Sequence, residues 1–338
     1  MKAICARILM LGVLLAVGSS CERIRETEGD CNPYYYLQFV YDKTLPPSDA
    51  FSKQVESVDV YVFDANTGAF VKHYADKGEP LGEIGYRMPL DLKPGDYQFV
   101  AWCGLDGNEG HFTVPQSIAR PEDLTCKMAR KYDPDGLAYS DYDLHPLFHG
   151  KVTATLPDTQ GEHVVTVYLM KDTNQISLSL NHMSGALDPE RFEVTMEDCN
   201  GFMAYDNSLL DDEWIEYRPW SLRGGVVDVE TSDSTMGEAG FLLAEFVVAR
   251  MMKDHDCQIS ILDKETGNIV FSIPLVKWAL QLRSARYSDM DEQEYLDRED
   301  TYNLMVFLQD DEKNKSNWVT VSIIINGWKI VEQGDWEL

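Results

Sequence analysis

The sequence predicts an all-β protein that is divided into two β-rich halves. Three observations predict it. Apolar and polar residues alternate over many short segments from Tyr34 onward, turn residues separate these segments, and one turn motif occurs once in each half. The 338 residues are enough for two domains of roughly 100–200 residues each.

The first half contains a clear hairpin signal. Val55–Asp64 alternates between three valines on one side and Tyr61 and Phe63 on the other. The turn residues Asp64–Gly68 follow, and a second strand is expected over Ala69–Tyr74. Further strands are expected over 97–102, after a Pro-Gly-Asp turn, and over 164–170 and 175–180, which flank a polar break at 171–174.

The second half repeats this pattern and adds one clear helix. Leu275–Leu282 follows Pro274, and a proline just before the first turn favours the start of a helix. A second short helix is expected near Asp289–Leu296. Strands are expected over 191–196, 241–249, 257–262, 268–273, 302–309 and 318–326.

One segment of the first half has a gapless counterpart in the second. Val62–Val71 (VFDANTGAFV) aligns with Ile261–Val270 (ILDKETGNIV), and both contain Asp-x-x-Thr-Gly. Because this motif is common in hairpin turns, chance similarity is the alternative to a shared design. We interpret the match as two similarly built domains, an N-terminal one over 34–171 and a C-terminal one over 172–338.

The N-terminus has the layout of an export signal. Lys2 and Arg7 come before the apolar run Ile8–Val17, and the small residues Gly18–Ser20 follow it. The run is shorter than the about 20 apolar residues that span a bilayer. We therefore expect residues 1–20 to be removed as a signal peptide and residues 21–33, which are mostly polar, to form a flexible tether.

Cys21, directly after the small residues, resembles the lipidated cysteine of a bacterial lipobox. In that chemistry the thiol takes a diacylglycerol and the cysteine becomes the new N-terminus. Gly18 departs from the leucine that is usual at its position. We expect a lipoprotein anchored through Cys21, since several acyl chains together give a stable anchor. The alternative is simple secretion with Cys21 as a disulfide partner.

The charge balance excludes one class of partner. The chain has 57 acidic and 29 basic residues, a net charge of -28. A surface this negative repels phosphate backbones and anionic lipid headgroups. We therefore expect no nucleic-acid partner and no electrostatic adsorption to a membrane.

The sequence motifs of common enzymes and metal sites are missing. No Gly-x-Ser-x-Gly, Gly-x-Gly-x-x-Gly or Walker motif occurs. His145 and His149 have the spacing of a zinc-binding helix, but Pro146 stands where such a helix needs its glutamate. The Asp-rich segments 133–136 and 141–143 lack the spacing of a calcium loop and are interpreted as turns. We expect no catalytic residue, no metal and no cofactor, with an unrecognised surface hydrolase as the alternative.

Five cysteines remain if Cys5 is removed and Cys21 is lipidated. The pairs Cys103–Cys126 and Cys199–Cys257 would each form a disulfide within one half and would leave Cys31 odd. Buried free thiols are the equal alternative. Five cysteines are too few to be the main scaffold of a chain this long.

Several segments, taken in order, resemble a known family. They are Phe39–Asp42, Val58–Asp64, Leu92–Trp102, Glu294–Glu299, Tyr302–Leu308, Trp318 and Ile325–Trp328, with Cys21 before them. Their order and combination resemble the Bacteroidetes-type fimbrial anchor and minor-subunit lipoproteins that accompany fimbrillin-type pili. The resemblance spans nearly the whole chain after the signal.

The resemblance implies two tandem transthyretin-like β-sandwich domains and a non-catalytic role. The protein would be a surface-exposed outer-membrane lipoprotein that holds the base of a fimbrium and limits its length, and its partners would be pilin subunits joined by β-strand addition. Ten residues follow Trp328, without an evident donor segment, which favours an anchor over a stalk subunit. The alternative is a surface glycan-binding lipoprotein that uses some of its 7 Trp and 17 Tyr as stacking platforms.

Overall fold

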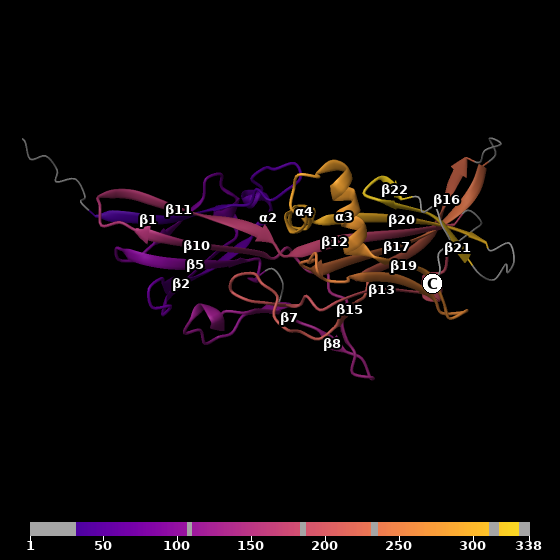
Figure 1. The fold of residues 1–338 in the computed structure, drawn as a ribbon, viewed down its shortest axis with the longest axis horizontal. Coiled ribbons are helices and arrows are strands. Elements are labelled where there is room, and N and C mark those ends of the chain that lie inside the picture. Colours follow the sequence, from indigo (N-terminus) through magenta and orange to yellow (C-terminus); the bar gives the residue numbers. More distant parts are fainter. Residues whose placement is uncertain (1–31, 107–109, 183–186, 231–235, 311–317, 331–338) are drawn as a thin grey trace, which may run out of the picture.

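The computed structural model describes residues 32–106, 110–182, 187–230, 236–310 and 318–330. Their secondary structure is predominantly β, so the predicted all-β class is confirmed. The molecule is elongated, with one sheet at one end of the long axis and two further sheets at the other (Figure 1). No helix in this part of the chain is both long and apolar enough to cross a bilayer.

The first sheet contains seven strands in the order β3-β2-β5-β10-β11-β1-β4. β1 lies parallel to β11, and the other neighbours are antiparallel. The strands are β1 (Pro33–Val40), β2 (Ser57–Asp64), β3 (Phe70–Lys77), β4 (Arg87–Leu90), β5 (Gly95–Cys103), β10 (Phe148–Leu156) and β11 (Gly161–Lys171).

The two faces of β2 belong to two separate cores. Val58, Val60 and Val62 are buried in a first core formed within the first half of the chain. Tyr61 and Phe63 point the other way, into a second core that continues into the second half. The alternation in the sequence predicted this division, because successive side chains of a strand point to opposite faces.

Two six-stranded sheets build the second half. Leu178 of β12 and Ile261 of β18 lie in the same second core, so the two sheets pack face to face as in a β-sandwich. One sheet has the order β16-β17-β12-β20-β21-β22 and the other β19-β18-β13-β15-β9-β8. Their strands are β12 (Thr173–His182), β16 (Ser221–Glu230), β17 (Met236–Ala249), β20 (Thr301–Asp310), β21 (Trp318–Ile325), β22 (Trp328–Ile330), β13 (Phe192–Asp198), β15 (Ile215–Tyr217), β18 (Gln258–Asp263) and β19 (Asn268–Pro274).

Strands from the first half complete the sheets of the second. β8 (Lys131–Tyr132) and β9 (Ala138–Ser140) lie at the end of the β19 sheet, where β9 runs parallel to β15. A smaller sheet joins β14 (Phe202–Met203), β7 (Cys126–Met128) and β6 (Phe112–Thr113). Strands β6 to β9 therefore pair with the second half or with one another, although they precede the second half in sequence.

Within the described ranges, the helices are few and short. They are α2 (Phe51–Gln54), α3 (Leu275–Arg286) and α4 (Glu292–Arg298), and 3-10 turns lie over Glu79–Gly82, Pro121–Asp123 and Pro189–Arg191. α3 begins directly after Pro274, as predicted. α4 confirms the second predicted helix, and the Asp291 side chain caps it by accepting hydrogen bonds from the backbone N–H groups of Gln293 and Glu294.

The repeated turn motif forms a similar hairpin in each half. The pairs β2–β3 and β18–β19 both contain a register shift shortly before the turn. The N–H of Gly68 donates to Asp64 O at 2.8 Å, and the N–H of Gly267 donates to Asp263 O at 2.7 Å. Both glycines have positive φ, 70° and 71°, which glycine adopts at little cost. The shared sequence therefore encodes one local structure twice.

Several features were not expected from the sequence, among them β10, β16 and the buried state of residues 171–174. β10 was not predicted, because Gly150 interrupts its alternation; a Cβ there would lie 2.6 Å from Val167 Cγ1 of β11, so the glycine permits a close approach of the two strands. The polar break at 171–174 is also shorter than expected. Only Asp172 separates β11 from β12, and all four residues are buried.

Candidate functional site

The predicted lipidation site, Cys21, lies outside the described residues. The first described strand shows where the segment that follows it joins the folded body. β1 begins at Pro33, which pairs with Gly161, at the end of the long axis away from the β20–β22 sheet (Figure 1). A lipid on Cys21 would be connected to this end.

A buried polar cluster lies where the first sheet passes into the second half. Asp172 is fully buried, and its Oδ1 accepts a hydrogen bond from Asn207 Nδ2 at 2.8 Å. Burial raises the pKa of Asp172 to about 7. Arg250 forms a two-point ion pair with Asp297 and donates from Nη1 to Asn207 O at 2.9 Å. In low-dielectric surroundings such a network fixes the geometry of the segments that it joins.

Further bonds cross from one half to the other. Lys171 Nζ lies 2.6 Å from Asp300 Oδ2, and Arg298 Nη1 donates to Asp42 O at 3.2 Å. Trp102 of the first sheet is buried in the core that the second half shares. The elongated molecule is therefore braced at its middle by both polar and apolar contacts.

Each sheet ends in strands that have one partner strand within the described chain. The longest is β16, which pairs with β17. Its Val226 and Val227 are 46% and 48% exposed, and it lies at the opposite end of the long axis from the start of β1 (Figure 1). The edge strand β3 also has exposed apolar residues, but the N–H of Phe70 already donates to Ala119 O. A sheet edge that has one neighbouring strand and exposed apolar side chains, as β16 has, can receive an added strand.

A groove of about 290 Å³ lies beside Trp220. The Trp220 side chain is 41% exposed, and Asp143, Gln175 and Asn303 contribute polar groups to the lining. An exposed aromatic ring next to carboxylate and amide groups suits a ligand that has one apolar face and several hydroxyl groups.

The histidines and acids that the sequence singled out have structural roles where the structure gives their contacts. His149 is buried, with Nε2 2.9 Å from Tyr205 O, and burial lowers its pKa to about 4. Asp133 Oδ1 accepts from the backbone N–H groups of Asp135 and Leu137, so the turn interpretation is confirmed there. Across the described ranges, none of these residues belongs to a group of three potential metal ligands.

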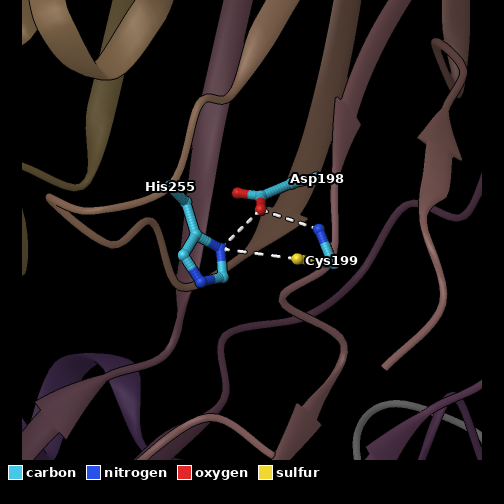
Figure 2. A group of neighbouring side chains, drawn as sticks. All are labelled: Asp198, Cys199 and His255. Atoms are coloured by element: carbon cyan, nitrogen blue, oxygen red, sulfur yellow. Dashed lines mark hydrogen bonds and ion pairs between the residues drawn. The ribbon is translucent and has the colours of Figure 1, made fainter. Parts of the chain in front are cut away.

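Asp198, Cys199 and His255 do form such a group (Figure 2). Asp198 ends β13, and His255 lies in the loop between β17 and β18. His255 Nδ1 lies 2.7 Å from Asp198 Oδ1 and 3.9 Å from Cys199 Sγ. The hydrogen bond with Asp198 raises the pKa of the imidazole. The sequence analysis missed the group, because 56 residues separate Cys199 from His255 and no spacing rule joins them.

The four described cysteines are free thiols. Cys103 is buried in the first core and Cys126 in the second, so they are not placed to form a disulfide. Cys257 is buried and Cys199 is partly exposed, and they are not bonded either. Of the two alternatives left open by the sequence, the free-thiol alternative holds for these four residues.

A protein-family model and several solved structures match most of the chain. The model of the fimbrillin-A associated anchor proteins Mfa1 and Mfa2 matches residues 27–334. No curated protein matches the chain.

Three of the solved structures show the extent of the similarity. A candidate adhesin from Bacteroides thetaiotaomicron is 31% identical, with a TM-score of 0.75, and the match covers 89% of this chain and 98% of that one. A candidate polysaccharide-binding protein from the same organism is 27% identical over the same shares, with a TM-score of 0.72. The fimbrial anchor protein Mfa2 from Porphyromonas gingivalis is 18% identical and shares the fold, with a TM-score of 0.63 over 89% of this chain and 99% of that one.

Proposed function

Because the chain belongs to the family of fimbrillin-A associated anchor proteins, we propose that it is the lipid-anchored base of a fimbrium. The lipid on Cys21 holds one end of the molecule at the outer membrane, on the cell surface, and the other end binds a pilin subunit. A fibre that ends on a membrane-anchored subunit stays on the cell and stops growing at that end. The family consists of fimbrial proteins, which supports a non-catalytic role.

The observation that carries the proposal is the placement of the two ends along the long axis (Figure 1). The body joins the N-terminal segment at Pro33, and the edge strand β16 lies at the other end. The buried cluster around Asp172 and Arg250 braces the middle, so a pull on one end is transmitted to the other. An extended segment from Cys21 to Asn32 reaches at most roughly 40 Å, which is several Debye lengths of about 8 Å. The acidic body can therefore stand away from anionic headgroups.

Replacement of Cys21 by Ala tests the anchor. The variant should appear in the medium together with fimbriae, as measured by immunoblots of membrane and medium fractions and by electron microscopy. Cys31→Ala is the matched control, since it removes a nearby cysteine and leaves the lipobox unchanged, and it should remain with the membrane. Fimbriae that stay on cells producing Cys21→Ala would overturn the anchoring role.

We propose β16 as the strand that receives an extended segment of the pilin subunit. It offers ten residues with one partner strand, and its exposed valines can pack against the side chains of an added strand. The double variant Val226→Lys, Val227→Lys places charges on this edge and should reduce co-purification of fimbrial subunits with the detergent-solubilised protein. Val71→Lys, at a similarly exposed valine of β3, is the control. If co-purification of fimbrial subunits falls equally in both variants, or in neither, β16 is not the receiving strand.

The groove beside Trp220 favours a second candidate function, the binding of a surface glycan. The Bacteroides thetaiotaomicron structure described as polysaccharide-binding is 27% identical to this chain. Trp220→Ala should then abolish binding to a bacterial or host polysaccharide, whereas Trp214→Ala, at an exposed tryptophan that does not line the groove, should not. Absence of polysaccharide binding by the unaltered protein excludes this candidate.

A further inference from the structure

The cluster of Asp198, Cys199 and His255 brings three kinds of ligand atom together (Figure 2). One carboxylate oxygen, one thiol sulfur and one imidazole nitrogen lie within 4.8 Å of one another. Oxygen, sulfur and nitrogen donors of these types bind Zn²⁺ at about 2.0–2.3 Å. We propose that the cluster is a Zn²⁺ site with three protein ligands and a fourth position for water, separate from the fimbrial role.

The same geometry argues against a catalytic site in which Cys199 is the nucleophile and His255 is its base. In a catalytic triad the two imidazole nitrogens serve different partners, one the nucleophile and the other the acid. Here Nδ1 of His255 faces both Asp198 Oδ1 and Cys199 Sγ. A single nitrogen cannot donate to the carboxylate and accept the thiol proton together. Convergence of all three side chains on one point fits a shared cation instead.

Asp198 lacks the compensation that a nearby buried acid has. Its side chain is 1% exposed. Its Oδ1 accepts a hydrogen bond from the backbone N–H of Cys199 at 2.7 Å and pairs with His255, whereas its Oδ2 has no hydrogen-bond partner in the described structure. By contrast, Asp212 accepts two bonds from Arg130, at 2.7 and 2.8 Å. A buried carboxylate without a cationic side chain such as Arg130 beside it is costly, and a divalent cation at Oδ1 would offset the cost of its charge.

The backbone around the cluster is held in place before any ion binds. Asn200 Nδ2 donates to Ala249 O at 3.0 Å and to Arg250 O at 3.1 Å, and Tyr217 Oη donates to Asn200 Oδ1. These bonds join the residue after Cys199 to the start of the loop that carries His255. Cys199 and His255 are both partly exposed, so an ion can enter from solvent.

Binding displaces the protons on the ligand atoms. The Cys199 thiol loses its proton to solvent and binds as a thiolate, and Asp198 binds as a carboxylate. His255 gives up the Nδ1 proton that it donates to Asp198, to solvent if Nε2 is already protonated and otherwise to Nε2 through solvent, and binds through the Nδ1 lone pair. The Nδ1–Oδ1 distance must then open from 2.7 Å to about 3.3 Å, the separation of two ligands about 2.0 Å from a tetrahedral ion. The site would tie the end of β13 to the 250–257 loop.

Titration of the metal-free purified protein with Co²⁺ and Zn²⁺ tests the site. One Co²⁺ per chain should bind and give a thiolate-to-metal charge-transfer absorption, and Zn²⁺ should displace it. Cys199→Ala should lose this absorption and lower the Zn²⁺ affinity by at least about 100-fold. Cys103→Ala, which removes a buried free thiol from the first core, is the control and should keep both.

The second variant is His255→Gln, at a partly exposed position, with its fold checked by circular dichroism. It should lose tight Zn²⁺ binding while it remains folded. An absent charge-transfer absorption in the unaltered protein overturns the proposal. Zn²⁺ binding that is unchanged in Cys199→Ala also overturns it, because the ion then sits on surface acids.

Discussion

Arg250 and Asp297 form a buried two-point ion pair, with Nε 2.8 Å from Oδ1 and Nη2 2.9 Å from Oδ2. Arg250 follows β17 and Asp297 lies in α4, so the pair fastens the helix to the junction between the two halves. Their side chains are 9% and 5% exposed. Loss of one partner would leave a buried charge without compensation.

Arg250→Met should therefore destabilise the protein by about 3–5 kcal/mol. Both Asp297 and Asp172 lose their positive neighbour in this variant. Arg223 and Glu245 form a more exposed pair, and Arg223→Met should cost only about 0–1 kcal/mol. Urea unfolding measures both values. Similar losses in the two variants would show that burial of the Arg250 pair does not matter.

Asp172→Asn should remove part of the pH dependence of stability. The pKa of Asp172 is about 7 in the folded protein, above the ordinary value of 3.8. The folded chain therefore holds this proton more tightly, and the contribution of Asp172 is fully present below about pH 4 and is lost as the pH rises through 7. The slope is at most about 1.4 kcal/mol per pH unit.

Urea unfolding of both proteins at about pH 5 and pH 7 measures this difference. Glu299, whose pKa burial also raises to about 7, is present in both proteins and cancels in the comparison. The unaltered protein should lose more stability than Asp172→Asn between the two pH values. If the stabilities of the two proteins changed in parallel with pH, the conclusion that Asp172 is a buried acid with a raised pKa would be contradicted.

The contribution of His149 to stability should depend on pH in the opposite direction to that of Asp172. Its pKa is about 4 in the folded protein, below the ordinary 6.5. The unfolded chain takes up the proton first, so this stability is present above about pH 6.5 and is lost as the pH falls toward 4. His149→Gln keeps an N–H group for the Tyr205 carbonyl but does not titrate. Its stability should fall less over this interval than that of the unaltered protein, as unfolding at several pH values would reveal.

Two glycine substitutions should differ strongly in cost. Gly267 has a φ of 71°, and an added Cβ would meet no atom within 4 Å, so Gly267→Ala should cost only backbone strain of about 1 kcal/mol. Gly104 has a φ of 92°, and its Cβ would lie 2.1 Å from Pro146 O. Gly104→Ala should therefore cost more than about 3 kcal/mol. Thermal unfolding compares them, and equal melting temperatures would contradict the steric argument.

Local patterns in the sequence predicted a large part of the fold. The alternation of Val55–Asp64 predicted β2 and its two faces, Pro274 marked the start of α3, and Asp-x-x-Thr-Gly marked both hairpins. These features depend on residues close together in the chain. The pairing of β9 with β15 was not predicted, because short strands far apart in sequence carry no signal of their register.

The sequence by itself determined the all-β class, the main hairpins and the resemblance to a fimbrial anchor family, since periodicity and motif order are properties of neighbouring residues. Only the tertiary structure decided that the cysteines at 103, 126, 199 and 257 are free, and that the polar residues at 171–174 are buried. It also decided that Asp198 and Cys199 meet His255. The physical reason is that burial and side-chain convergence depend on packing between distant segments, which composition and spacing do not contain.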